Sequence, residues 1–254
     1  MKFRCERDAL VEQLSTASRA VSSRGGALPV LTGIHLKASD DVLTMTGSDL
    51  EITVRSSIAV SVSEPGEAVL PSRIAVDIVR SLDSGAIDVE VSGDEAKISG
   101  GRSQFAVRTL PVDDFPSIAD PTGDQVSVAT VDLTAGLKQV VRAASGDDAR
   151  PILTGVLMSA EDGGLRLVAT DSYRLAVRDL PDATVLSEGQ KVLVPSRALD
   201  ELTRVLGDSD EVTVCLGERE VSFDVVIEDG SVQVTTRLIE GEFPNYRQLI
   251  PSSY

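Results

Sequence analysis

The sequence predicts an α+β protein built from two tandem copies of one domain. Its 254 residues suit two domains of ordinary size better than one. Segments with apolar residues at helical spacing are followed by segments that alternate with period two, and short Gly/Asp turns separate the latter. Motifs of the first half recur in the same order in the second half. Because the strands do not alternate regularly with helices, antiparallel sheets are favoured over a Rossmann-like sheet.

Each copy is expected to open with a helix. Residues 8–21 and 132–144 both carry an apolar stripe at helical spacing. A serine follows each stretch directly, Ser22 in the first copy and Ser145 in the second. The matching stripe residues are Leu10, Leu14, Ala17 and Val21 in the first copy and Leu133, Leu137, Val140 and Ala144 in the second.

Strands follow this helix in each copy. The string Leu31-Thr32-Gly33-Ile34 matches Leu153-Thr154-Gly155-Val156, and a proline lies just before each. Downstream, Asp49 and Asp171 each precede residues that alternate between apolar and polar, which predicts half-buried strands.

A second helix is expected to open at Pro71-Ser72-Arg73 and at Pro195-Ser196-Arg197, with the serine as a possible N-terminal cap. More strands follow, and Phe115-Pro116 and Phe243-Pro244 close the two copies. The strand residues are Ile87, Val89, Val91, Phe105 and Val107 in copy one and Val212, Val214, Val221, Phe223, Val225, Val232 and Val234 in copy two. A polar, turn-rich stretch at 119–124 predicts domains 1–122 and 123–254.

The sequence gives little support to an enzyme. It contains no phosphate loop, no dinucleotide fingerprint, no nucleophile elbow and no cluster with metal-ligand spacing, so we expect neither catalysis nor a cofactor or metal. The single histidine, His35, is expected in a strand, and Cys5 and Cys215 as buried reduced thiols. Asp40-Asp41 lacks the fixed ligand spacing of a calcium loop and is expected to be solvated turn charge. A hydrolase using paired carboxylates would need two acids that converge in one polar cleft, which a repeat does not favour. An export signal and a membrane-length apolar run are also missing, so we expect a cytoplasmic protein.

The formal net charge of −16 argues against a uniformly phosphate-binding surface. Basic residues are nevertheless concentrated in the expected helices, whereas much of the acid lies in strands and turns. From composition alone this pattern favours ordinary amphipathic helices with a solvated side. The alternative is one basic face that lies along phosphates without reading bases. With aromatic residues at 3%, single-strand binding by stacking is disfavoured.

Several strings resemble one known family. Residues 241–251 (GEFPNYRQLIP) are similar to the signature that closes the second domain of bacterial sliding clamps, the beta subunit of DNA polymerase III. Residues 168–176 (VATDSYRLA) resemble a strand motif of the same domain, and residues 28–31 and 150–153 resemble the motifs that open the strands. The resemblance extends from Met1 to Tyr254.

The resemblance implies the DNA-clamp fold, in which each domain packs two helices on antiparallel sheets. It implies a non-catalytic processivity factor: a ring that encircles duplex DNA without sequence preference and tethers the polymerase III alpha subunit. A clamp loader opens the ring, and other proteins with a clamp-binding motif dock on it. Family subunits have three domains and form a homodimeric ring, so the third domain is expected to be absent from this chain. The alternative is a tandem-repeat scaffold that binds proteins independently of DNA.

The resemblance also implies a groove for a short, largely apolar peptide. The residues at matched positions are Leu153, Thr170, Ser172, Tyr173, Arg174, Leu175, Pro244 and Leu249. Ser172-Tyr173 stands where many family members have Gly-His, and Gln248 where some have Arg. The expected DNA-binding residues are Arg24, Arg73, Arg80, Lys138, Arg142, Arg150 and Arg197.

Overall fold

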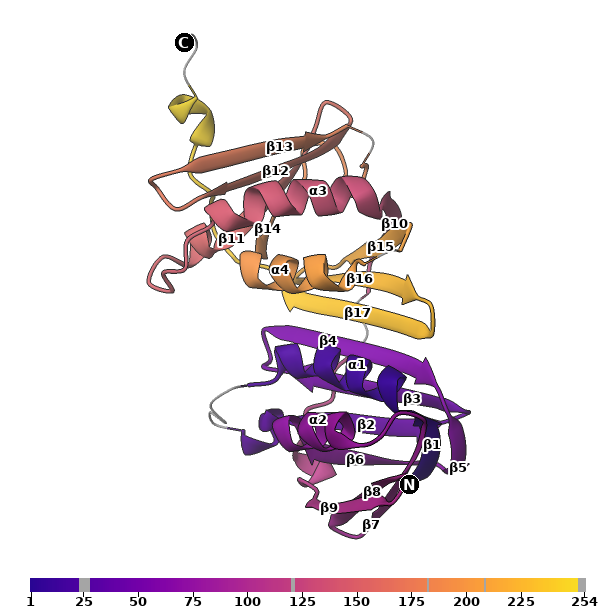
Figure 1. The fold of residues 1–254 in the computed structure, drawn as a ribbon. Helices are drawn as coiled ribbons and strands as arrows, with labels where there is room; N and C mark the ends of the chain where they lie inside the picture. Colours follow the sequence, from indigo (N-terminus) through magenta and orange to yellow (C-terminus); the bar gives the residue numbers. More distant parts are fainter. Residues whose placement is uncertain (23–27, 120–121, 182, 208, 251–254) are drawn as a thin grey trace. The chain divides into compact units, whose positions relative to one another are not determined.

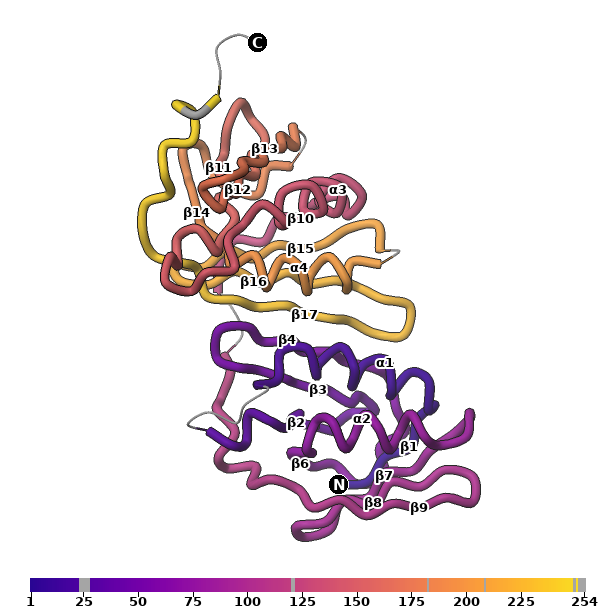
Figure 2. Tube along the Cα trace, turned by 60° about the vertical axis from the view of Figure 1, so that its left-hand side comes forward, coloured from indigo at the N-terminus to yellow at the C-terminus, as the bar shows by residue number. Residues whose placement is uncertain are grey.

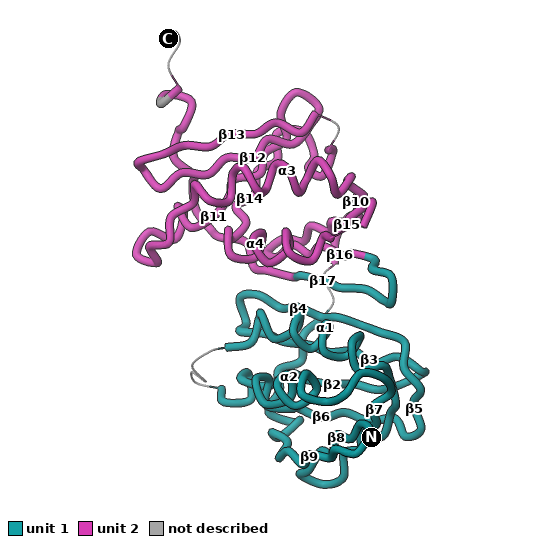
Figure 3. Tube along the Cα trace, viewed as in Figure 1, with its two compact units in different colours: residues 1–120, 226–234 teal, residues 121–225, 235–254 magenta. Residues whose placement is uncertain are grey.

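The fold is described from a computed structural model of the chain, which describes residues 1–22, 28–119, 122–181, 183–207 and 209–250. The chain divides into two compact units (Figure 3). Unit 1 comprises Met1–Asp120 and Val226–Val234, and unit 2 comprises Pro121–Val225 and Thr235–Tyr254. Each unit is described by itself.

Unit 1 contains two α-helices among its described residues, α1 (Arg7–Ala17) and α2 (Ser72–Ser81). A single 3-10 turn, Ser18–Ala20, extends α1. The strands are β1 (Lys2–Glu6), β2 (Gly33–Ser39), β3 (Val42–Ser48), β4 (Ile52–Ala59), β5 (Ser61–Glu64), β6 (Gly66–Pro71), β7 (Ala86–Ser92), β8 (Glu95–Gly100) and β9 (Ser103–Arg108).

The strands of unit 1 pair antiparallel in two groups, in the orders β5-β1-β7-β8-β9 and β4-β3-β2-β6. Burial alternates along β4, as the period-two pattern predicts. Helix α1 packs on β3 and β4, and α2 packs on β2 and β6. Figures 1 and 2 show the two helices side by side over the strands. Phe3, Leu14 and Val79 are fully buried in the core that results.

Unit 2 repeats this plan. Its α-helices are α3 (Thr130–Val140) and α4 (Ser196–Val205), and a 3-10 turn at Val141–Ala143 extends α3. The strands of the second copy of the repeat are β10 (Asp124–Ala129), β11 (Gly155–Glu161), β12 (Gly164–Thr170), β13 (Leu175–Leu180), β14 (Lys191–Pro195), β15 (Glu211–Leu216), β16 (Glu220–Ile227) and β17 (Gly230–Arg237).

The strand order confirms the internal repeat. The orders β10-β15-β16-β17 and β13-β12-β11-β14 in the second copy reproduce β1-β7-β8-β9 and β4-β3-β2-β6 in the first. Helix α3 packs on β12 and β13, and α4 packs on β11 and β14, as α1 and α2 do on the equivalent strands. Among the described elements, β5 has no counterpart in the second copy. The expected α+β class, with two helices on antiparallel strands in each copy, is confirmed.

Some expectations about single elements were wrong. Each copy begins with a strand, β1 or β10, and not with a helix. The first helices are shorter than expected, because α1 and α3 tighten into 3-10 turns near their ends. Ser72 is the first residue inside α2, so Pro71 occupies the cap position and no side chain caps the helix. Strand β8, which the sequence reading missed, lies between the two strands expected after α2.

Candidate functional site

The turn after β12 is an exposed feature of unit 2 that several hydrogen bonds hold in place. The carboxylate Oδ1 of Asp171 accepts hydrogen bonds from the backbone N–H groups of Tyr173 and Arg174, both at 2.9 Å. Thr170 Oγ1 accepts from Ser172 N at 3.1 Å and donates to Arg174 O at 2.7 Å. The backbone hydrogen bonds hold the pKa of Asp171 below its usual value, because they stabilise the charged form.

The same turn recurs in unit 1. Asp49 Oδ1 accepts from Glu51 N at 3.1 Å and from Ile52 N at 2.8 Å, and Ser48 Oγ accepts from Leu50 N at 3.1 Å. Leu50 and Ser172 occupy equivalent positions, with φ values of 75° and 80°. The turn is therefore part of the repeated fold, and function must reside in the side chains that it displays.

Two side chains distinguish the second turn: Tyr173, which the turn displays, and Arg150, which contacts it. Tyr173 is 94% exposed, an unusual state for an aromatic residue on a turn held by four hydrogen bonds. Arg150 donates from Nη1 to Ser172 Oγ at 3.3 Å and from Nε to Asp147 Oδ2 at 2.9 Å. The structure thus brings Arg150, expected to contact DNA, next to Ser172, expected to contact peptide.

An apolar cluster lies beside this turn. Leu175, directly after it, is half-buried against the buried residues Leu157, Val168 and Tyr246. Ile152, Ile239 and Phe243 pack against the same cluster. Leu153 is buried, and its backbone oxygen accepts a hydrogen bond from Ser145 N at 2.8 Å. One apolar cluster therefore includes residues from the 3-10 turn before β11, from β13 and from the segment 243–250, which we call the closing segment.

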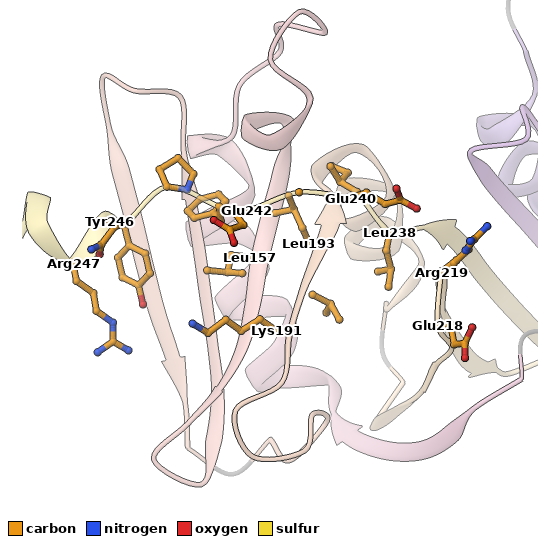
Figure 4. Close-up of a pocket in the computed structure, with 16 residues that line it drawn as sticks. Leu157, Lys191, Leu193, Glu218, Arg219, Leu238, Glu240, Glu242, Tyr246 and Arg247 are labelled. Atoms are coloured by element: carbon orange, nitrogen blue, oxygen red, sulfur yellow. The ribbon is translucent and has the colours of Figure 1, made fainter.

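The closing segment also covers a pocket of about 720 Å³ in unit 2. Figure 4 shows Leu157 and Leu193 between Tyr246 and Arg247 at one end and Glu218 and Arg219 at the other. Of the residues expected to bind peptide, Pro244 lines this pocket. The apolar floor with charged ends is a usual form for a groove that holds an extended ligand.

The expected peptide-binding residues divide into two groups. Thr170, Ser172, Tyr173, Arg174 and Leu175 form one continuous turn, and Leu153 and Pro244 reach the same region through Ile152 and Phe243. Leu249 is in a 3-10 turn, Tyr246–Leu249, but its side chain lies outside the described residues. Leu175 of the turn and Ile152 and Phe243, the chain neighbours of Leu153 and Pro244, pack on one apolar cluster.

A half-buried carboxylate, which the sequence did not reveal, joins the closing segment to the strands. Glu161, at the end of β11, is 14% exposed and accepts hydrogen bonds from Ser159 Oγ at 3.0 Å and Tyr246 OH at 3.4 Å. It also forms ion pairs with Arg166 and with Arg247, the latter at 2.7 Å.

The charges around Glu161 favour its ionised form. Burial by itself raises the pKa of Glu161, but the hydrogen bonds from Arg247 and Ser159 and the charge of Arg166 outweigh it, so the pKa lies below its usual value. Arg166 in turn holds Asp179 on β13 through two hydrogen bonds, one of them 3.0 Å long. No local sequence pattern marks this network, because its members are far apart along the chain.

The residues expected to contact DNA lie largely on the helices. Arg73 and Arg80 are exposed on α2, Lys138 on α3, Arg197 on α4, and Arg142 in the turn after α3. Arg80 donates to Ser15 Oγ of α1 at 3.5 Å, and Arg73 pairs with Asp77 at 3.9 Å. Arg24 lies outside the described residues.

The helices and their 3-10 extensions carry more basic than acidic residues, the reverse of the chain as a whole. The basic ones are Arg7, Arg19, Arg73, Arg80, Lys138, Arg142, Arg197 and Arg204, and the acidic ones are Asp8, Glu12, Asp77, Asp132, Asp200 and Glu201. In each unit, one helical layer is therefore less acidic than the strands and turns, which favours the approach of phosphate to that layer.

Other candidate sites are weak. His35 lies in β2, where it stacks on Phe115 at 5.1 Å and contacts Glu67 Oε2 at 3.2 Å. Burial lowers the pKa of His35 in spite of Glu67. Both cysteines are buried and free, as expected. Within the part of the chain that the structure describes, no three His, Cys, Asp or Glu side chains are grouped to hold a metal, and no helix is long and apolar enough to cross a membrane.

Comparisons with known proteins agree with the repeated fold. Residues 1–119 match the family model "DNA polymerase III beta subunit, N-terminal domain", and residues 127–245 match the model of its central domain. The chain is 32% identical to the beta sliding clamp of Streptomyces coelicolor and 35% identical to that of Staphylococcus aureus. It is covered completely in both alignments and spans 68% and 69% of these relatives.

Solved structures show the same similarity. The DNA polymerase sliding clamp from Bacillus subtilis superposes with a TM-score of 0.90 at 33% identity, over 100% of this chain and 68% of the other. A Pseudomonas aeruginosa clamp solved with bound griselimycin gives the same TM-score, identity and coverage. With both units matched in sequence and the whole chain matched in fold, this protein belongs to the DNA polymerase III beta subunit family, the bacterial sliding clamps.

Proposed function

We propose that this protein is a processivity factor of DNA replication, a non-catalytic clamp that encircles duplex DNA in the cytoplasm and tethers the replicative polymerase. The observation that carries this proposal is the match of both units, over the whole chain, to sliding clamps. We infer the domains 1–122 and 123–254 as two clamp domains of the ring, which a homodimer would close.

The helical layers support the DNA part of the proposal. Their exposed cations, among them Arg73, Lys138 and Arg142, attract phosphate, while the net charge of −16 prevents tight neutralisation of the backbone. Weak contacts of this kind allow sliding, because no phosphate or base is held in one register. The remaining proposed DNA-binding residues are Arg24, Arg80, Arg150 and Arg197.

The turn and the closing segment of unit 2 support partner docking. An apolar floor around Leu175, a projecting Tyr173 and the exposed guanidinium of Arg174 suit a short apolar peptide with polar groups at its edge. Thr170 is buried and its hydroxyl group is bonded within the turn, so we propose that it shapes the site. We propose that the alpha subunit of the polymerase, the clamp loader and other proteins with a clamp-binding motif dock here. The other proposed contacts are Leu153, Ser172, Pro244 and Leu249.

The experiment is primer extension by the replicative polymerase on a long single-primed circular template, with the complete protein and its clamp loader. We expect the DNA made in one binding event of the polymerase to be much longer when the clamp is present than when it is absent. Products of equal length with and without the protein, in the presence of a DNA trap for released polymerase, would contradict the proposal.

A further inference from the structure

Glu161 joins the closing segment to the strands of unit 2 at a single carboxylate. Its partners come from β11 (Ser159), β12 (Arg166) and the closing segment (Tyr246 and Arg247). Arg166 extends the network to β13 through Asp179. The carboxylate is largely buried, so these contacts are screened less by solvent than a surface ion pair.

The first copy of the repeat shows that the fold does not require this network. Ser39 and Thr44 stand in β2 and β3 where Glu161 and Arg166 stand in β11 and β12, and Ser57 stands where Asp179 does. Thr44 Oγ1 and Ser57 Oγ form one neutral hydrogen bond of 3.2 Å in place of the Arg166–Asp179 pair. Unit 1 nevertheless has the same strand order and helix packing.

The network is directed at the part of unit 2 that bears the docking residues. Tyr246 is buried in the cluster with Leu157 and Val168, on which Leu175 packs. Its hydroxyl group and the guanidinium of Arg247 both reach Glu161. Along the chain, Tyr246 and Arg247 lie between Pro244 and Leu249, so fixing the first pair restricts the backbone of the second.

We propose that Glu161 is a positioning residue of the docking site: it anchors Tyr246 and Arg247 and thereby holds the closing segment in the conformation that receives an apolar peptide. The inference rests on the proposed docking function and adds to it a residue that does not itself contact the partner. It assigns the contacts of Glu161 with Tyr246 and Arg247 to recognition, and leaves the Arg166–Asp179 pair to stabilise the strands.

The test measures peptide affinity and local order in the complete protein. The probe is a labelled synthetic peptide whose apolar residues are leucine and phenylalanine, titrated by fluorescence anisotropy. The variants are Glu161→Gln, which keeps the side-chain size and removes the charge, and Arg247→Met, which removes the other half of the anchor at an exposed position. The matched control is Asp179→Asn, which weakens the same network on the strand side without touching the closing segment.

We expect Glu161→Gln and Arg247→Met each to raise the peptide Kd about tenfold, and the double variant to raise it little further, because both remove one contact. Amide hydrogen exchange should accelerate in residues 243–250 and stay unchanged in α3 and α4. Asp179→Asn should lower the melting temperature while leaving the Kd within about twofold of the unmodified protein.

Two results would overturn the inference while docking stands. One is an unchanged Kd in Arg247→Met and Glu161→Gln when Leu175→Ala weakens the same peptide. The other is a loss of affinity in Asp179→Asn as large as in Glu161→Gln, which would make the role merely structural. If Glu161→Gln fails to fold, Glu161→Asp, which keeps the charge but shortens the side chain, replaces it in the same titration and exchange measurement. If the unmodified protein does not bind the peptide, docking and positioning are both wrong.

Discussion

In the proposed docking site of unit 2, single residues have different tasks. Asp171 and Thr170 shape the turn through their hydrogen bonds, Tyr173 projects from it, and Leu175 packs below it on the apolar cluster. Side chains with different tasks should respond differently to substitution, and two residues allow a direct check.

Leu175→Ala is expected to raise the peptide Kd about tenfold and to lower the free energy of unfolding by about 1–2 kcal/mol, because it removes half-buried apolar contacts. Val177→Ala is the matched control: Val177 lies on the same strand, is 38% exposed and is not part of the cluster. Anisotropy titration and urea unfolding measure the two effects. Equal affinities for both variants would remove Leu175 from the docking site.

Cys5 is expected to be inert in the folded protein. Burial, reinforced by the charges of Glu6 and Asp88, raises the pKa of the Cys5 thiol to about 12, so the reactive thiolate is almost absent at pH 8. A thiol reagent such as dithionitrobenzoate should modify Cys5 and the buried Cys215 only after unfolding. Rapid labelling of either thiol in the native protein would contradict the placement of β1 or β15.

At the scale of elements, the turn between β3 and β4 has a left-handed residue whose conformational cost can be measured. Leu50 adopts a left-handed backbone conformation that costs a non-glycine residue about 1 kcal/mol, and its side chain is 41% exposed. Leu50→Gly is therefore expected to raise the free energy of unfolding, with a gain of up to about 1 kcal/mol. Leu50→Ala keeps the strain and serves as the control in the same urea titration. A glycine variant less stable than the alanine variant would refute the turn geometry.

The helical layer makes a second prediction at this scale. Lys138→Glu combined with Arg142→Glu places acid on the exposed side of α3 and the turn after it, where we propose that phosphate approaches. DNA affinity should fall about tenfold at low salt, and less at high salt because screening weakens the contacts. Arg178→Glu, an exposed reversal on β13, should have a much smaller effect in the same binding assay.

The repeat was predictable from the sequence because its anchors are local strings, such as Leu31-Thr32-Gly33-Ile34 and its match at 153–156. The helix positions followed from their apolar spacing, but the 3-10 endings did not, because apolar spacing does not reveal that the last turn tightens. Strand β1 was missed although Phe3 and Cys5 alternate as a strand requires, since five residues carry little signal.

The candidate site was predictable only where residues are neighbours in sequence. Residues 170–175 form one turn, so their proximity was implied by the motif. Glu161 and its partners Arg166 and Arg247 come together through strand pairing and the path of the closing segment. Contacts of this kind depend on tertiary structure, and no local pattern reveals them.

For the whole molecule, the formal net charge of −16 has to be reconciled with the proposed role on DNA, which is itself negatively charged. Tight binding through phosphates would need many neutralising contacts, which this composition does not supply. A closed ring resolves the conflict, because a topological link keeps protein and DNA together even when each contact is weak. The proposed mechanism therefore predicts that the protein stays on DNA without free ends and slides off DNA with free ends, and that moderate salt changes this little.

The most direct measurement loads the complete protein on nicked circular DNA with its clamp loader, cuts the DNA once, and follows the retained protein by gel filtration. We predict that the protein stays on the circle at moderate salt and leaves within minutes once free ends exist. Equal retention on circular and linear DNA would contradict encirclement and leave ordinary surface binding as the explanation.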